Sequence, residues 1–265
     1  MAFCEIRCGD LVYFTSSLIP VPHAFTTRHG GISCGIFETL NLGRGLGDDP
    51  KALKENYARV SCAVGFEADR FVFSRQVHGD TVRPCTAVDA LPPEGDVPYE
   101  ADGLITNEKN VPLVISVADC VPILLYDPVR GAVGAVHAGW RGTVQDIAAK
   151  AVRRLAAEYG SRPEDIRAAL GPSISLCCFE TGPEVAKAVS ALLGPRGAEF
   201  ALPRGDKYMV DLKGINAHRL EDAGLSPENI DISHLCTSCR CETFWSHRKT
   251  KGKRGGQAAL IMMKG

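Results

Sequence analysis

Residues 121–143 read VPILLYDPVRGAVGAVHAGWRGT, and this stretch decides the fold class. Two apolar runs, PILLYD and GAVGAVHAG, lie on either side of the turn signal YDPVRG, so they predict an antiparallel hairpin. Both runs are almost continuously apolar, which indicates strands covered on both faces. The second run ends near His137. Two glycines that bracket Trp140 and Arg141 then lead into an amphipathic helix predicted over 143–160.

Short breakers divide the rest of the chain into further elements of both kinds. Strands are expected at about 11–14, 23–28, 70–78, 102–106, 112–120, 166–170, 208–212, 229–235 and 257–263. Other helices are expected at 48–65, 182–194 and 213–225. The first begins with Asp48 or Asp49 as N-cap and Pro50 near its first position. This pattern predicts an α/β fold with a mixed sheet core and helices outside. No shift in composition marks a boundary, so we expect a single domain over residues 1–265.

Composition excludes several classes of protein. The formal net charge of the 265 residues is −1, so no overall field attracts nucleic acid. No apolar run approaches the roughly 20 residues that span a bilayer, and the N-terminus lacks the apolar core of a signal peptide. The chain holds 11 cysteines, which we interpret as mostly reduced thiols in a cytoplasmic protein. Nothing in the sequence indicates the oligomeric state.

His78, Cys120 and His137 each fall at the end of a predicted strand, where α/β folds place reactive groups. Two imidazoles and a thiolate suit a borderline-soft divalent ion, and three protein ligands leave a fourth position open, as in catalytic zinc sites. The gaps between the three residues are long, so spacing alone does not decide the point. Two separate core histidines and a buried thiol remain the alternative.

Three basic segments could bind an anion. In HAGWRGT, glycines allow close backbone approach, the amides of the following helix favour an anion, and Arg141 offers a bidentate donor. Arg28 lies in a similar segment, TTRHGGIS, and Arg248 begins a run of basic residues that ends at Arg254. The alternatives are a tight turn with a solvent-facing arginine and a solvated hairpin tip.

The segment CTSCRC at 236–241 resembles half a zinc ribbon. A ribbon needs a second, similarly spaced pair, and Cys177 and Cys178 are adjacent, so we do not expect a structural zinc there. The sequence also lacks a dinucleotide-binding glycine motif after a strand, a P-loop, and the signature of zinc base deaminases.

Taken in order, TTRHGGIS, QVHG, ADGLIT, VADCVPILL, AVHAGWRGT, GPSISLCCFE, CTSC, FWSHRK and GQAALIMM resemble the laccase-domain family, also called multicopper polyphenol oxidase-like or peptidoglycan editing factor-like. The resemblance runs from about residue 20 to the C-terminus. It implies a single domain with the layers α/β/β/α, and a zinc ion held by His78, Cys120 and His137, with copper as the alternative metal.

The resemblance also implies an activity. Members are described as purine nucleoside phosphorylases acting on adenosine, inosine and methylthioadenosine, with adenosine deaminase side activity. Here nucleoside and phosphate would be the partners, with no nucleic acid and no membrane. Cys120, His137 and Arg248 are the expected catalytic residues. The residues expected to bind substrate or phosphate are Arg28, Gln76, Arg141 and Arg248.

Two other descriptions of the family compete with this one. A copper oxidase of the laccase type needs many histidines, typically in H-x-H pairs, and none of the seven histidines here forms such a pair. An amidase acting on a peptidoglycan precursor would use Cys120 as nucleophile and His137 as base, although a zinc-bound thiolate is less available for attack. The chain also departs from the family at Gly255-Gly256-Gln257, where the usual arginine is displaced by two positions to Arg254.

Overall fold

The predicted hairpin is the centre of the structure. In the computed structural model, which describes residues 3–66 and 68–265, β7 (Val121–Asp127) pairs antiparallel with β8 (Ala132–Ala138). Every residue of both strands is buried, as their apolar sequences predict. The pair lies in the middle of a six-stranded sheet of order β13-β9-β7-β8-β5-β4. Its other members are β13 (Ile230–Ile232), β9 (Arg167–Leu170), β5 (Gly103–Thr106) and β4 (Val82–Pro84).

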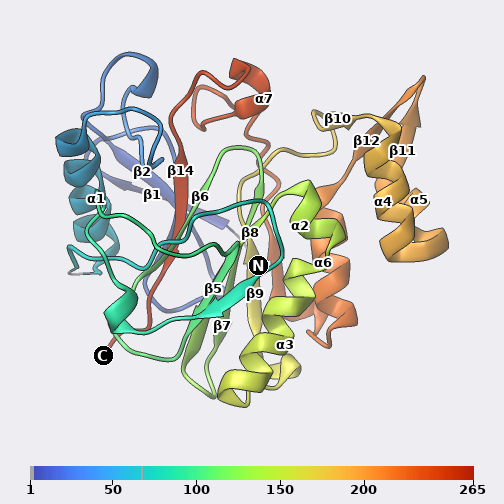
Figure 1. Ribbon diagram of the computed structural model, residues 1–265, viewed down its shortest axis with the longest axis horizontal. Helices are drawn as coiled ribbons and strands as arrows, with labels where there is room; N and C mark the ends of the chain where they lie inside the picture. The colour runs from blue at the N-terminus through green and yellow to red at the C-terminus, as the bar shows by residue number, and fades with distance from the viewer. Residues whose placement is uncertain (1–2, 67) are drawn as a thin grey trace.

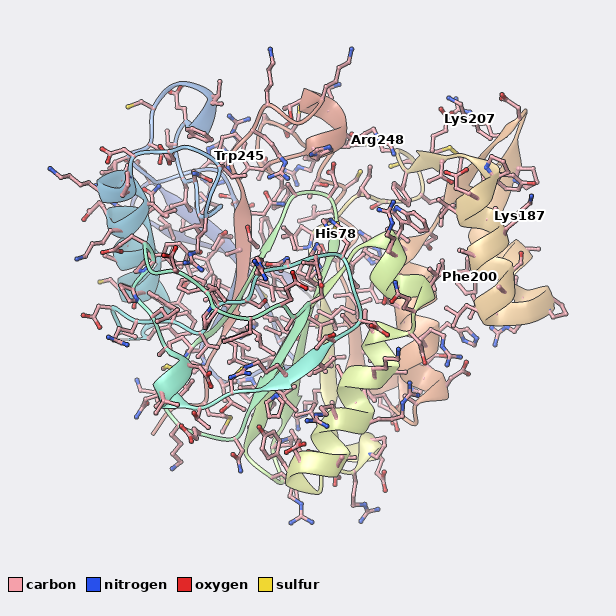
Figure 2. All side chains as sticks on the ribbon, in the orientation of Figure 1. His78, Lys187, Phe200, Lys207, Trp245 and Arg248 are labelled. Atoms are coloured by element: carbon pink, nitrogen blue, oxygen red, sulfur yellow. The ribbon has the colours of Figure 1, made fainter. Side chains whose placement is uncertain are left out.

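A second, five-stranded sheet packs on one face of the first (Figure 1). Its order is β1 (Phe3–Cys8), β2 (Leu11–Ser16), β3 (His23–Thr26), β14 (Gln257–Ile261) and β6 (Leu113–Val117). A small three-stranded sheet stands to one side, formed by β10 (Glu180–Thr181), β12 (Lys207–Val210) and β11 (Ala201–Arg204). Lys187, Lys207 and Phe200 mark this projecting part in Figure 2.

Helices cover the outer faces of the two large sheets. The described helices are α1 (Pro50–Val64), α2 (Trp140–Val144), α3 (Ile147–Tyr159), α4 (Pro183–Leu193), α5 (Gly197–Phe200), α6 (Leu212–Asp222) and α7 (His247–Thr250). Short 3-10 turns lie at Gly35–Phe37, Ala87–Asp89, Pro163–Asp165, Gly194–Arg196 and Pro227–Asn229. One core packs the five-stranded sheet against α1, one lies between the sheets, and one packs the six-stranded sheet against α3, α4 and α6. The layers are therefore α/β/β/α, and the fold is an α/β single domain, as expected.

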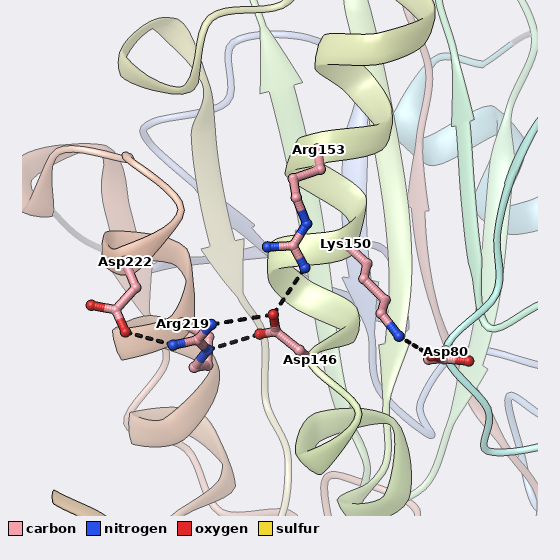
Figure 3. A network of polar contacts seen from close by, with 6 residues as sticks. All are labelled: Asp80, Asp146, Lys150, Arg153, Arg219 and Asp222. Atoms are coloured by element: carbon pink, nitrogen blue, oxygen red, sulfur yellow. Dashed lines mark hydrogen bonds and ion pairs between the residues drawn. The ribbon is translucent and has the colours of Figure 1, made fainter. Parts of the chain in front are cut away.

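Local sequence signals explain the helix ends. The carboxylate of Asp49 accepts a hydrogen bond from the amide of Lys51, and α1 stops at Gly65, whose φ is 77°. The helix predicted over 143–160 begins earlier and is interrupted at Asp146, which adopts a left-handed φ of 67°. Arg153 and Arg219 both donate to the Asp146 carboxylate and so fasten the break to α6 (Figure 3). Burial alone would raise the pKa of Asp146, but these hydrogen bonds lower it.

The strand expected at 70–78 is wrong. This segment makes single bridges through Phe71, Val72 and Arg75 to three separate parts of the chain, so no partner strand runs beside it in constant register. Gln76 bonds the backbone of Ser116 with both ends of its amide. His78 then takes a left-handed φ of 59°. The hairpin β1–β2, in which β1 was not expected, adds an edge to the five-stranded sheet. Among the described residues, no helix is long and apolar enough to cross a membrane.

Candidate metal centre

His78, Cys120 and His137 come together as the sequence predicts. One imidazole nitrogen of each histidine and the Cys120 sulfur all lie within 4.8 Å of one another. All three residues were expected at strand ends, but only His137 lies at one, the end of β8. Cys120 is in the tight turn just before β7, and His78 is in a loop, so the expectation of three strand ends is wrong. The turn with Cys120 reaches the end of β8 from the β7 side, and the loop with His78 reaches it from the β5 side.

Asp102 fixes this arrangement. Its carboxylate is fully buried just before β5 and accepts hydrogen bonds from the amides of Val77, His78 and Gly79 at 2.8–3.1 Å. It also accepts one from Nδ1 of His137 at 2.8 Å. With Nδ1 engaged, Nε2 is the nitrogen left to face Cys120. A carboxylate that orients a ligand histidine in this way is the usual outer partner of a metal site. In the sequence, the only indication of this role of Asp102 is its position just before a buried strand.

The glycines of HAGWRGT make room for the histidine loop. A Cβ on Gly139 would lie 2.9 Å from the His78 ring and 3.2 Å from the Cys120 sulfur. A Cβ on Gly142 would lie 2.7 Å from the carbonyl oxygen of Gly79. The contacts of 2.9 Å with the His78 ring and 2.7 Å with Gly79 are closer than real Cβ atoms adopt, so glycine at positions 139 and 142 lets the cluster close.

The electrostatics of the cluster couple its members. Burial alone raises the pKa of the Cys120 thiol, but the charge of His137 and hydrogen bonds from His137 and His78 outweigh it and lower the pKa to about 6. Burial lowers the pKa of His137, but the Cys120 thiolate and the Asp102 carboxylate raise it to about 9. The two opposite shifts favour a thiolate at Cys120 beside an imidazolium at His137. Two nitrogens and a thiolate that converge in this way fit a zinc ion, which would displace the shared proton.

Two adjoining cavities give access to the cluster. The smaller, of about 130 Å³, is lined by His78, Cys120 and His137. The larger, of about 870 Å³, shares with it the residues Gly43, Arg44, Leu46, Gln76 and Ser116. Such a volume is in the range of sites for small organic ligands. Gln76, expected to bind substrate, thus lies at the junction of the two cavities.

Two arginines, Arg254 and Arg44, line the smaller cavity. Neither is among the arginines that the sequence predicts to bind an anion. Nη1 of Arg254 donates to the carbonyl of Gly255, whereas its buried Nε has no hydrogen-bond partner. Burial lowers the pKa of Arg254, and the charges of Asp119 and Cys120 oppose that shift, so the guanidinium lies near the cluster. The basic run from Arg248 to Arg254 was recognised in the sequence, but the residue of that run that lines the cavity is Arg254 and not Arg248.

The three arginines expected to bind an anion have other contacts. Arg28 stacks on Trp245 and donates to the carbonyls of Glu38 and Cys241. Arg141 stacks on its neighbour Trp140 and is exposed. None of the three, Arg248 included, is among the residues lining either cavity in the described part of the chain.

Arg248 is the second residue of α7, and its label lies above that of His78 in the view of Figure 2. Its amide donates to Asp119 at 2.6 Å, and its guanidinium donates to the carbonyl of Cys178 at 3.0 Å. The other carboxylate oxygen of Asp119 accepts from Thr237. Asp119, the neighbour of Cys120, therefore ties loops together, and Asp102 is the carboxylate that orients a ligand.

Comparison with known proteins agrees with this geometry. Residues 22–264 match the family described as multi-copper polyphenol oxidoreductase laccase. The chain belongs to this family. It is 39% identical over 247 residues to purine nucleoside phosphorylase YlmD of Bacillus subtilis, covering 91% of this chain and 87% of that protein. A purine nucleoside phosphorylase of Deinococcus radiodurans is 42% identical, with 92% and 89% covered. The crystal structure of YlmD from Geobacillus stearothermophilus superposes with a TM-score of 0.92 at 33% identity over 98% of both chains.

Replacing Asp102 should weaken metal binding in this family member. In an Asp102→Asn variant the amide group cannot accept all of the bonds that the carboxylate accepts, so His137 and the His78 loop lose their orientation. We expect zinc affinity to fall by about 10- to 100-fold, measured by competition with a chromophoric chelator. Asp119→Asn is the matched control and should keep its affinity. An equal loss in both variants would contradict the role assigned to Asp102.

Proposed function

We propose that this chain is a purine nucleoside phosphorylase that cleaves adenosine, inosine and methylthioadenosine with phosphate, with adenosine deaminase side activity at a His/Cys/His zinc site. One observation carries the proposal: a cavity large enough for a nucleoside adjoins a small cavity lined by the ligand cluster and Arg254. The names of the relatives from Bacillus subtilis and Deinococcus radiodurans support the same reaction class.

We assign the nucleoside to the larger cavity and phosphate to the smaller one. The larger one offers the rings of Tyr57 and Phe73 and the side chain of Leu53, which suit a purine and its sugar. The smaller one offers Arg254, whose guanidinium suits a phosphate oxygen. Arg44 lines both cavities. In phosphorolysis the bond from the sugar carbon to the base nitrogen breaks and a bond from that carbon to a phosphate oxygen forms, so the two substrates must meet where the cavities join.

The cluster residues would hold the metal in the smaller cavity, next to that junction. His78, Cys120 and His137 are its ligands, and Asp102 keeps Nε2 of His137 directed at it. A zinc ion with three protein ligands supplies a Lewis acid with an open position for substrate. Gln76, fixed by the Ser116 backbone, keeps its place at the cavity wall. The catalytic role of Arg248 and the binding roles of Arg28 and Arg141 remain predictions.

An amidase that acts on a peptidoglycan precursor is the second candidate. Cys120, His137 and Asp102 form a chain of thiol, imidazole and carboxylate, the arrangement of a cysteine nucleophile with its base and orienting group. A copper-dependent polyphenol oxidoreductase, suggested by the family's description, has less support. Among the described residues, the groups that could hold a metal contain two histidines, and both belong to this single cluster.

Product analysis tests the reaction class. We expect adenosine incubated with the purified protein to give free adenine when phosphate is present and none when it is omitted, because phosphate is the attacking group. Chromatography of both mixtures is the measurement. Inosine formed without phosphate would reveal the deaminase activity. If neither product forms, the phosphorylase proposal fails and the amidase becomes the better candidate.

Removing Arg254 tests the anion site. A hydrogen bond to a charged group contributes about 1.5–3 kcal/mol, so Arg254→Ala should raise KM for phosphate by about 10- to 100-fold. Arg248→Ala should raise it as well if the expectation from the sequence holds. Arg59→Ala, on the exposed face of α1, is the control and should leave KM unchanged. Initial rates at varied phosphate give the values, and an unchanged KM in both test variants would exclude these arginines as phosphate ligands.

Alkylation separates the two roles of Cys120. As a zinc ligand, its thiolate is protected, so iodoacetamide should modify Cys120 slowly in zinc-loaded protein and quickly after a chelator removes the metal. A free nucleophile would react quickly in both samples. Mass spectrometry of the Cys120 peptide gives the rates, with exposed Cys62 as the internal reference. A substrate-derived adduct on Cys120 in zinc-loaded, active protein would favour the amidase.

A further inference from the structure

Four cysteines gather at a second place in the molecule. Cys177 and Cys178 lie in the turn between β9 and β10, and Cys236 and Cys239 lie in the loop between β13 and α7. Their four sulfur atoms are all within 4.8 Å of one another. We call them the thiol cluster. The sequence spacing argued against a zinc ribbon here, but the fold supplies the second pair from a segment about 60 residues away.

The distances within the thiol cluster suit a shared metal ion. The sulfur of Cys177 is 3.8 Å from that of Cys178 and 3.6 Å from that of Cys239, and the sulfurs of Cys178 and Cys239 are 3.4 Å apart. A tetrahedral zinc thiolate site with bonds of about 2.3 Å separates its sulfurs by about 3.8 Å. A disulfide would bring two of them to about 2.0 Å. All four cysteines are free thiols in this structure.

The backbone around the thiol cluster holds the two loops in register. Ser173 and Cys236 form a parallel bridge, and the amide of Thr237 donates to the carbonyl of Ser173. The amide of Ser175 donates to the sulfur of Cys236, a contact that stabilises a thiolate more than a thiol. The approach of the four sulfurs therefore does not depend on flexible side chains alone.

A buried cation lies beside the thiol cluster. The ammonium group of Lys213, on α6, donates to the carbonyls of Ser233 and Leu235, one residue before Cys236. Lys213 is only 5% exposed, and among residues 3–66 and 68–265 no carboxylate forms a hydrogen bond or ion pair with it; the charges that act on it are those of Asp211, Cys236 and Cys177. Buried charges are normally compensated. Four thiolates around a divalent cation carry a net charge of −2, which would provide that compensation.

We propose that Cys177, Cys178, Cys236 and Cys239 form a structural tetrathiolate site for a thiophilic divalent cation, with Zn²⁺ as the ion that best fits the donors and their spacing. Binding releases the thiol protons and crosslinks the two loops. The carbonyl of Cys178 accepts from Arg248, and Thr237 donates to Asp119, so the crosslink holds the base of α7. The site is separate from the His78, Cys120 and His137 cluster and does not depend on the proposed activity.

Metal analysis of variants tests the site. A protein carrying His78→Ala and His137→Ala, which disables the first cluster, should keep about one zinc per chain. Adding Cys178→Ser and Cys239→Ser should remove that zinc, whereas adding Cys241→Ser, a neighbouring cysteine outside the thiol cluster, should not. Mass spectrometry of elemental content is the measurement. Equal zinc content with and without the two serines would overturn the proposal.

Cobalt spectra provide a readout that needs no variant. Full-length protein loaded with Co²⁺ should show thiolate charge-transfer bands stronger than the single Co–S bond of Cys120 can give, together with the visible bands of tetrahedral coordination by four sulfurs. Intact mass under denaturing, non-reducing conditions should match fully reduced cysteines. Cobalt spectra that lack the bands of a four-thiolate centre would refute the site. A mass two hydrogens lower, with a disulfide mapped to these residues, would also refute it. Both results hold even if the variants fail to fold.

Discussion

The buried carboxylate of Asp102 is the interaction on which the candidate metal centre depends. It accepts hydrogen bonds from three backbone amides of the His78 loop and from Nδ1 of His137. Burial alone would raise the pKa of Asp102, but these bonds lower it and keep the group ionised. The same anion thus positions two ligands that lie far apart in the chain. A neutral side chain at this place could not accept all four of these hydrogen bonds.

The parts of the fold that sequence predicts well are those set by neighbours in the chain. The hairpin around YDPVRG follows from a turn flanked by apolar runs, and α1 follows from the cap at Asp49 and the glycine at its end. The segment 70–78 shows the limit. Its apolar residues look like a strand, but strand formation needs a partner in constant register, and here each bridge is made to a different segment.

The candidate site divides in the same way. The three ligands could be named because each residue type carries its own chemistry, whereas Asp102 and Arg254 act only through contacts made by the folded chain. The thiol cluster is the clearest case. Spacing along the sequence argues against a zinc site when two cysteines are adjacent, yet the bridge between Ser173 and Cys236 brings the pairs together. Ligand spacing is informative for sites within one local motif and loses that value when two distant loops share one site.

Charge balance explains how a cation and an anion can share one small cavity. Asp102 and Cys120 contribute negative charge at the cavity, and protonated His137, Arg254 and Arg44 contribute positive charge, so the five groups sum to +1. A ligating imidazole must be neutral, so a divalent cation that binds the cluster expels the proton of His137. The sum then rises to +2, beside the Arg254 guanidinium, whose Nε has no hydrogen-bond partner. In the proposed phosphorylase, phosphate bound there would offset that surplus, so by linkage each ion would strengthen the binding of the other.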